Sequence, residues 1–439
     1  MIKKLCIVFL AFLALNVYAQ EGTVSPYSFY GIGSIKFKGT VENRSMGNIS
    51  IFSDSIHVNL RNPAANGGNK LKMFNEEGRL VKFTVGASHT ETTLKTANQS
   101  DNTNVSTFDY MALSLPMGKF GATIGVTPFT SVGYRLEAED MVADTILPVN
   151  RYTGEGGLNR VFLSFGYQLT KNLSVGVEAN YFFGNIQNNA LEFVYDDEGD
   201  PLQYQSRQRN RSDLSGFNFN IGAIYNPMIS DRFQLTTAFV YTPSADLKSQ
   251  NERIFETVAI NPFSGIEFPV GEIIADLSQD GLETTDLTLP SKTSFGAGIG
   301  QPHRWFVGAE YSFLKTSEFA NPIAPNVTNS EFEDSSSFNL GGFVIPNYRS
   351  FNSYWSRVVY RAGVRFENTG LKINGESINE FGISFGVGLP MGRLLSNTNI
   401  GFEYGQLGTT SANLVQENFF SFQISLSLND RWFQKRKLN

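Results

Sequence analysis

The sequence has little of several residues on which whole classes of protein depend. One cysteine among 439 residues excludes a disulfide within the chain, and charged residues make up only 17%. The three histidines, His57, His89 and His303, are too scattered for a metal site, so no metal or other cofactor is expected. No apolar run of about 20 residues indicates a membrane helix. The net charge of -6 argues against a nucleic-acid partner.

Phenylalanine and glycine are abundant instead. The chain contains 38 Phe, 17 Tyr and 41 Gly, and 41% of its residues are hydrophobic. Many aromatic residues without long apolar runs are typical of a transmembrane β-barrel, whose strands turn one face to lipid and the other to a polar lumen. We therefore predict an all-β fold.

Residues 1–19 have the pattern of a signal peptide. Lys3 and Lys4 precede an apolar stretch, Leu5 to Leu15, that is too short to span a bilayer. Small residues near Ala19 suit cleavage, so the mature chain should begin at Gln20 and lose the only cysteine, Cys6. The alternative is an N-terminal membrane anchor.

Short turns alternate with longer polar stretches in the rest of the chain. The turns lie at 115–119, 170–172, 226–228, 301–303 and 389–393, and the polar stretches at 91–104, 136–157, 196–212, 247–284, 316–335, 368–377 and 407–416. This pattern is typical of outer-membrane barrels, which have short periplasmic turns and long extracellular loops. We expect 247–284 to be the longest extracellular loop and both termini to be periplasmic.

About fourteen strands follow from this pattern, an even number as such barrels require. They are expected near 79–90, 105–116, 119–134, 158–169, 172–194, 213–226, 232–245, 285–300, 303–315, 336–347, 356–367, 378–390, 397–406 and 417–433. The alternation also predicts their faces. Between 172 and 183, Val175, Val177 and Tyr181 share the lipid face, while Glu178 and Asn180 share the luminal face.

Residues 20–78 lack strand periodicity and contain Asn62-Pro63-Ala64. Further motifs are Phe239 to Ser244, Leu289 to Gly298 and Trp305 to Tyr311. With these motifs the whole mature chain resembles the FadL-type long-chain fatty acid transporter family. The resemblance implies that 20–78 is a hatch containing Asn-Pro-Ala inside a barrel of residues 79–433, followed by a basic periplasmic tail at 434–439.

The resemblance implies two functions. The first is passive uptake of hydrophobic small molecules or lipids, such as long-chain fatty acids, across the outer membrane of a Gram-negative bacterium. The second is that of PorV-type barrels in the same superfamily, which serve other outer-membrane proteins as docking partners. A continuous apolar tunnel beside the hatch would favour uptake, and a polar or packed lumen would favour docking.

Arginines are the strongest candidates for a ligand site. Arg357, Arg361 and Arg365 share one parity and are predicted to line the lumen in a column, and Arg160 should point inward as well. An inward arginine could hold the carboxylate of an amphipathic ligand. The alternative is that these arginines brace the barrel by pairing with luminal carboxylates such as Glu178, Glu310 or Glu403.

Apolar candidates would contact an acyl chain. Met111 and Leu113 alternate with Tyr110 and Ala112, and one of these two faces must be luminal, while Phe162 shares the face of Arg160. We take Met111, Leu113 and Phe162 as candidates, together with Asn62, Pro63 and Ala64 of the hatch. Packing against the hatch is the alternative role.

Pro128 lies inside the third predicted strand and cannot donate to a β-ladder, so a bulge or break is expected there. The resemblance implies a kinked third strand that opens the wall sideways, with Pro128 as a candidate lateral gate. The alternative is a position near the extracellular rim.

Enzymatic function is not expected. Gly382-Ile383-Ser384-Phe385-Gly386 has the Gly-x-Ser-x-Gly spacing, but it lies in an alternating strand rather than a strand-to-helix turn. All three histidines also precede this serine, whereas the histidine of such hydrolases follows it.

Overall fold

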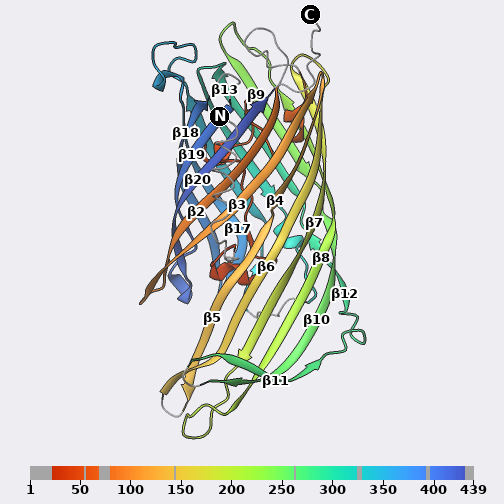
Figure 1. The fold of residues 1–439 in the computed structure, drawn as a ribbon, viewed down its shortest axis with the longest axis vertical. Coiled ribbons are helices and arrows are strands. Elements are labelled where there is room, and N and C mark those ends of the chain that lie inside the picture. Colours follow the sequence, from red (N-terminus) through yellow and green to blue (C-terminus); the bar gives the residue numbers. More distant parts are fainter. Residues whose placement is uncertain are drawn as a thin grey trace, which may run out of the picture.

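The computed structural model describes residues 22–53, 56–68, 80–142, 145–261, 264–323, 329–391 and 396–430. These residues form one closed antiparallel barrel of 14 strands, in which the last strand, β20 (Gln416–Asp430), pairs with β2 (Val81–Lys95) (Figure 1). The predicted all-β barrel is confirmed. In the described part of the chain, no helix is long and apolar enough to cross a membrane.

The wall is built by strands that follow one another in sequence. They are β2, β3 (Ser100–Met117), β4 (Phe120–Pro128) with β5 (Thr130–Val142), β6 (Thr145–Gln168), β7 (Leu173–Glu192), β8 (Tyr204–Tyr225), β9 (Gln234–Thr242) with β10 (Ala245–Ile260), β12 (Thr284–Leu289) with β13 (Lys292–Gln301), β14 (Trp305–Leu314), β16 (Ser335–Val344), β17 (Val359–Ile373), β18 (Glu376–Met391), β19 (Ser396–Leu407) and β20. Additional strands are β1 (Ser34–Ile35), β11 (Glu267–Ile274) and β15 (Ser330–Phe332).

The helical pieces are all short. They are η1 (Pro26–Phe29), α2 (Val41–Arg44), η2 (Pro63–Asn66), η4 (Thr316–Glu318), η5 (Trp355–Arg357) and η6 (Ser411–Asn413). The first three belong to the N-terminal segment, so the wall itself consists almost entirely of strands.

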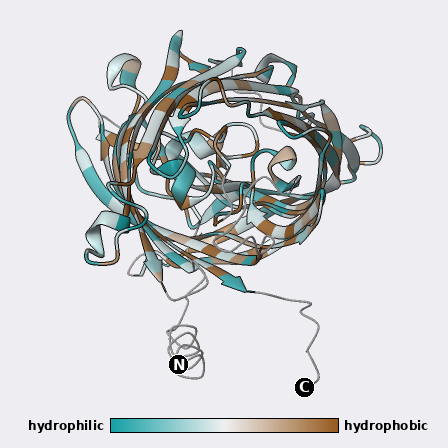
Figure 2. Ribbon diagram, turned by 90° about the horizontal axis from the view of Figure 1, so that it is seen from above, coloured by the Kyte–Doolittle hydropathy of each residue, from teal (hydrophilic) through white to brown (hydrophobic). Residues whose placement is uncertain are grey.

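The two faces of the wall differ as the alternation predicted. On β7, Val177 and Tyr181 are 55% and 40% exposed, whereas Glu178 and Asn180 between them are buried. Apolar and polar residues alternate along the strands in the same way around the ring (Figure 2). Outward side chains are exposed because the surrounding lipid would be their solvent, and inward polar side chains are buried because the lumen is filled.

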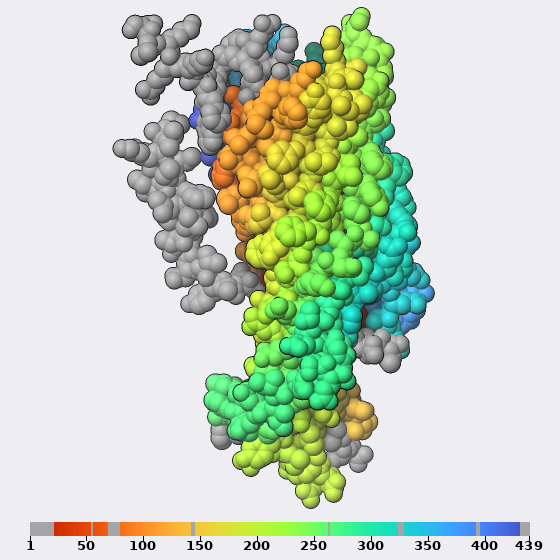
Figure 3. All heavy atoms as spheres, turned by 90° about the vertical axis from the view of Figure 1, so that its right-hand side faces the viewer, coloured from red at the N-terminus to blue at the C-terminus, as the bar shows by residue number. Residues whose placement is uncertain are grey.

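Most of the polar stretches between the strands are themselves strands, which corrects the loop prediction. β5 and β6 continue through 136–157, β8 begins at Tyr204, and β10, β11 and β12 occupy much of 247–284. These extensions project beyond the rest of the wall at one end of the barrel (Figures 1 and 3). We call this end the long-hairpin end and the opposite end, with the turns 118–119, 169–172 and 226–233, the short-turn end.

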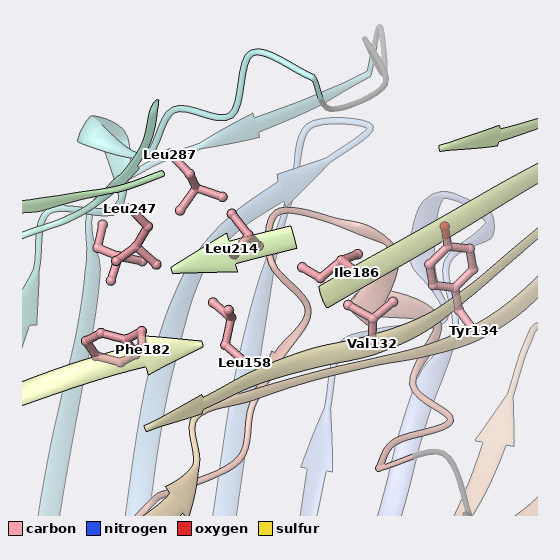
Figure 4. Packing of buried hydrophobic residues seen from close by; sticks show 9 residues of the cluster. Val132, Tyr134, Leu158, Phe182, Ile186, Leu214, Leu247 and Leu287 are labelled. Atoms are coloured by element: carbon pink, nitrogen blue, oxygen red, sulfur yellow. The ribbon is translucent and has the colours of Figure 1, made fainter. Parts of the chain in front are cut away.

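Residues 22–53 and 56–68, here called the luminal segment, lie inside the ring of strands (Figure 2). Val41, Val58 and Leu60 of this segment pack against Tyr110 and Phe162 of the wall. A second apolar cluster lines the lumen near the long-hairpin end (Figure 4). It consists of Val132, Tyr134, Leu158, Phe182, Ile186, Leu214, Leu247, Leu287 and Leu289, with Phe29 and Ile32 of the luminal segment packed against it.

The expected signal peptide at 1–19 and the basic tail at 434–439 lie outside the described residues. Both remain predictions from the sequence.

Candidate functional site: the filled lumen and a gap in its wall

Ion pairs hold the luminal segment against the wall. Helix α2 begins after Thr40, whose hydroxyl accepts from the backbone N–H of Asn43. The guanidinium of Arg44, at the other end of this helix, lies 3.3 Å from a carboxylate oxygen of Asp109 and 3.4 Å from one of Glu403. Two further ionic contacts of the segment are made by Lys38 with Glu380 at 2.5 Å and by Arg61 with Glu310 at 2.7 Å.

A wall arginine shares the carboxylates that bind the segment. Arg365 is 3% exposed and contacts Glu380 and, at 2.8 Å, Glu403. Glu380 and Glu403 therefore each lie between Arg365 of the wall and a cation of the luminal segment. In this arrangement the charges of the two parts neutralise each other only while the segment is in the lumen.

Two members of the predicted arginine column lie on one strand, whereas Arg357 lines the lumen from outside that strand, and binding of a ligand by the column stays a prediction. Arg361 and Arg365 are buried on the luminal face of β17, and Arg361 donates to Asn399 at 3.1 Å. Arg357 does not belong to the strand, because β17 begins only at Val359 and Arg357 ends the 3-10 helix η5. Its guanidinium donates to the carbonyl of Ser350 at 2.9 Å instead.

Arg160 and Phe162 point inward as predicted, and both contact the luminal segment. The guanidinium of Arg160 lies 5.4 Å from the ring centre of Phe37 and 5.3 Å from that of Phe162. It also lies 3.9 Å from a carboxylate oxygen of Glu178 and donates to Thr127 at 3.3 Å. These contacts correspond to the bracing alternative, and a role of either residue in binding a ligand stays a proposal.

Met111 and Leu113 lie on the outer face of β3, so their proposed luminal position is wrong. Met111 is 42% exposed, whereas Tyr110 and Ala112 are buried in the lumen. The register between β2 and β3 shifts between Gly86 and Ala87, which pair with Tyr110 and Phe108. The bulge leaves Asp109 as an extra residue and turns both Asp109 and Tyr110 inward.

The Asn62-Pro63-Ala64 turn rests on glycines of the wall. Asn62 caps the 3-10 helix η2 by accepting from the backbone N–H of Ala64 at 3.0 Å, and its amide donates to the carbonyl of Ala223 at 3.3 Å. Gly121, Gly166, Gly176 and Gly222 pair with one another across β4, β6, β7 and β8.

This row of glycines is a groove that side chains would fill. A Cβ atom on Gly176 would lie 2.5 Å from the backbone nitrogen of Ala64, and one on Gly222 would lie 2.9 Å from Cδ of Pro63. The backbone of the turn therefore packs directly on the backbone of the wall. The three residues pack on the wall here, and a role in binding a ligand stays a prediction.

Pro128 is the last residue of β4. The third strand of the wall, which consists of β4 and β5, is interrupted directly after it. Pro128 pairs with Asn159 of β6, and the ladder to β6 resumes with Val132 opposite Gly156. Gly156 and Gly157 have φ angles of 106° and 143°, which residues with side chains rarely adopt. The predicted break at Pro128 is thus present, well inside the long hairpin of β5 and β6 rather than at its rim.

The interruption ends the hydrogen-bonded pairing between the second wall strand, β3, and the third. β3 pairs with β4 only from Met111 to Met117, and β5 pairs on its free side with β1 of the luminal segment, at Thr130 and Ser131. Among the described residues, the part of β3 that precedes Met111 in the chain is paired with β2 alone. We call this interruption between β3 and β5 the lateral gap.

The luminal segment divides the lumen into two cavities. The outer cavity, of about 490 Å³, lies toward the long-hairpin end and is lined on either side of the lateral gap by Val105, Thr107, Asp109, Ile35 and Phe129. The inner cavity, of about 600 Å³, opens at the short-turn end and is lined by a different set of residues. Cationic and anionic side chains line the outer cavity beside apolar ones, so this cavity is not a purely apolar passage.

Lys36 lies in the outer cavity next to the lateral gap. Its backbone N–H donates to the carbonyl of Phe129 at 2.9 Å. Burial lowers the pKa of the Lys36 amino group to about 8, although the nearby carboxylate of Asp109 raises it. Lys36 could not be identified from the sequence, because residues 20–78 show no periodicity from which a face could be assigned.

The Gly-x-Ser-x-Gly motif at 382–386 forms part of a wall strand, and its serine binds the luminal segment. Ser384 lies within β18, and its hydroxyl accepts from the backbone N–H of Gly47 at 2.9 Å. In the described part of the chain, no group of three or more His, Cys, Asp or Glu residues has the arrangement of a metal site.

Comparison with known proteins agrees with this architecture. A sequence model of the family described as BamG matches residues 1–439. No curated protein gives a significant match.

Solved structures share the fold at low sequence identity. The toluene transporter TbuX of Ralstonia pickettii is 15% identical with a TM-score of 0.58, and the match covers 89% of this chain and 98% of TbuX. A FadL homologue of Pseudomonas aeruginosa is 11% identical with a TM-score of 0.55, covering 90% and 99%. The toluene transporter TodX of Pseudomonas putida is 13% identical with a TM-score of 0.53, covering 90% and 98%. The likeness shows a FadL-like barrel fold.

Proposed function

This chain belongs to the BamG family and has the fold of FadL-like outer-membrane barrels, and from this premise we propose that it is a docking subunit of an outer-membrane protein assembly. We place it in the outer membrane of a Gram-negative bacterium. The short-turn end then faces the periplasm and the long-hairpin end faces outward.

The observation that carries this proposal is the extension at the long-hairpin end. β6 and β8 have 24 and 22 residues, whereas crossing a bilayer takes about 9–11 residues of a tilted strand. The excess builds a sheet outside the membrane that ends in β11, which pairs with β10 alone among the described residues. A free strand edge is a surface to which another protein can add a strand.

Apolar side chains at the same place support docking. On β11, Phe268, Ile273 and Ile274 are 50%, 71% and 63% exposed, and Met141 and Ile146 nearby in the extension are each 65% exposed. Outside the membrane these residues would face water, and exposed apolar patches on soluble surfaces usually mark interaction sites. We assign this surface to another outer-membrane protein, because such a partner would be anchored beside it.

Variants of β11 test the proposal. The triple substitution Phe268→Ser, Ile273→Ser and Ile274→Ser should detach the partner, while the barrel still inserts and keeps its heat stability. The matched control is Met228→Ser with Ile229→Ser at the short-turn end, where the two side chains are 49% and 55% exposed. The measurement is the mass of the complex purified from native membranes in mild detergent. A complex of unchanged mass in the β11 variant would contradict the proposal.

Uptake of a hydrophobic compound is the second candidate function, and the lateral gap favours it. The outer cavity reaches this gap, and Val132, Leu158 and Phe182 of the apolar cluster lie close to the interruption between β4 and β5. Such a path would release a hydrophobic molecule sideways into the membrane. The test is transfer of a fluorescent fatty acid into vesicles containing the purified barrel. Transfer no faster than into vesicles with an unrelated closed barrel would exclude this function.

A further inference from the structure

The connection between β16 and β17 differs from the other turns at its end of the barrel. It runs from Ile345 to Val358, whereas the other described connections at this end are confined to 118–119, 169–172, 226–233 and 302–304. It contains four aromatic residues, Tyr348, Phe351, Tyr354 and Trp355, and two arginines, but neither aspartate nor glutamate. We call residues 345–358 the aromatic loop.

The aromatic loop is ordered by its own hydrogen bonds. The backbone N–H of Asn347 donates to the carbonyl of Ser356 at 2.7 Å, which closes the loop. The hydroxyls of Ser350 and Ser353 accept from the backbone N–H groups of Ser353 and Ser356 at 3.1 Å and 3.3 Å. These bonds hold the loop in one shape, and the hydroxyl of Tyr354 adds a bond to the carbonyl of Pro390 at 3.3 Å.

Two of the aromatic side chains of the loop are left largely on the surface. Phe351 is 94% exposed and Trp355 is 68% exposed, although Trp occurs only three times in the sequence. An ordered loop that presents Trp, Tyr, Phe and Arg together has the composition of a protein-binding hot spot. Because the loop is already folded, a partner would bind it at little cost in conformational entropy.

The charge of the loop indicates what kind of partner it fits. Among the described residues, neither Arg349 nor Arg357 forms an ion pair, and Arg357 lies over the ring of Tyr354 at 5.6 Å. Both arginines also line the inner cavity, and among the described residues that line it Glu42 has the only carboxylate. Glu42 is already bound by the amide of Asn399 at 2.7 Å. The loop and the cavity beneath it therefore favour an acidic ligand.

The position of the loop favours a protein over the lipid surface. Phe351, Tyr354 and Arg357 line the inner cavity together with His57 of the luminal segment. An aromatic belt residue would lie on the outer wall, as Phe120 does, which is 54% exposed and packs on Tyr167 at 4.4 Å between ring centres. A ligand of the aromatic loop would instead cover the mouth of the cavity.

We propose that the aromatic loop and the inner cavity form a docking site for an acidic segment of a periplasmic protein, which also packs an apolar side chain on the exposed aromatic residues of the loop. This site lies at the opposite end of the barrel from β11 and is independent of the docking surface proposed there. Through His57, the bound segment would also contact the residues that fill the lumen.

The test places a photo-crosslinking phenylalanine analogue at position 351 in living cells, with the same analogue at Phe120 as the matched control. We expect a crosslinked protein from position 351 only, with the crosslinked peptide identified by mass spectrometry as an acidic segment. Adding Arg349→Glu and Arg357→Glu should lower the yield of this crosslink roughly tenfold, the effect of losing one or two charged contacts.

Three outcomes would overturn the proposal. They are lipid adducts alone at position 351, a crosslinked segment without acidic residues, or a yield that the arginine substitutions leave unchanged. Heat-modifiable migration of each variant on gels shows whether the barrel is folded. The β11 variants should leave the crosslink at 351 intact, so failure of this site and failure of the proposed function can be distinguished.

Discussion

At the scale of single residues, the contact between luminal segment and wall depends on Arg365. Arg365→Met would leave Glu380 and Glu403 with Lys38 and Arg44 as their remaining cations. Removing one partner of a buried ion pair costs about 3 kcal/mol or more, and here two desolvated carboxylates each lose one of their two cations. We expect the free energy of unfolding in urea, followed by tryptophan fluorescence, to fall by about that amount.

Arg211→Met is the matched control for this substitution. Arg211 lies 3.1 Å from Asp213, and both side chains are about half exposed. An exposed pair contributes about 1 kcal/mol at most. Equal losses of stability in the two variants would show that Arg365 has no special place in the barrel.

Gly176 is the residue at which the Asn-Pro-Ala turn can be displaced by one methyl group. In Gly176→Ala the new Cβ would lie 2.5 Å from the backbone nitrogen of Ala64, and overpacking of this kind costs about 1–3 kcal/mol. We expect trypsin to cleave after Arg61 roughly tenfold faster in the folded barrel, because the turn leaves its groove more often. Gly271→Ala is the control, since a Cβ there meets nothing within 4 Å. Similar cleavage of both variants would contradict this account of the groove.

At the scale of elements, alternation predicted the strands well only where they cross the membrane. A strand that crosses the membrane needs one apolar face, so all fourteen wall strands could be recognised in the sequence by their alternating apolar and polar residues. The extensions of β6, β8 and β10 have water on their outer side and need no apolar face, which made them resemble polar loops. At the bulge in β3, the extra residue Asp109 shifts the alternation by one position. Met111 therefore lies on the outer face rather than on the luminal face where it was expected.

The luminal contacts were less accessible to sequence analysis. A charged residue on the polar face of a strand signals a luminal position, as it did for Arg361 and Arg365. The partner of such a residue depends on strand order and on the path of the luminal segment. Lys38 and Glu380, for example, are 342 positions apart in the chain.

The interruption between β4 and β5 after Pro128 leads to a separate prediction. Pro128→Val supplies the N–H that proline lacks and removes a reason for β4 to end at this position. If uptake occurs through the lateral gap, transfer of a fluorescent fatty acid into vesicles should fall, and the heat stability of the barrel should hold or rise. The control is Pro116→Val, in the part of β3 that is paired with β4 throughout. Unchanged transfer in an intact Pro128→Val barrel would exclude a gate at this strand.

At the scale of the whole molecule, the barrel consists of a wall that closes itself and a luminal segment that fills it. The wall ladder runs from β2 around to β20 and back through pairs that do not involve the luminal segment, and only the two-residue strand β1 joins β5. The wall should therefore form without the segment. The two cavities share no lining residue, so the segment is what separates the two ends of the lumen.

Deletion of residues 20–65, with the signal peptide retained, tests this division of roles. The shortened barrel should insert but lose stability, because Glu380, Glu403 and Glu310 each lose a cation from Lys38, Arg44 or Arg61. It should also conduct, since the outer and inner cavities would join into one polar channel. Ion conductance in planar bilayers measures the effect, and a barrel carrying only Arg61→Met is the control for lost charge without an opened lumen. Conductance equal to that of the intact protein would show that the wall closes the lumen by itself.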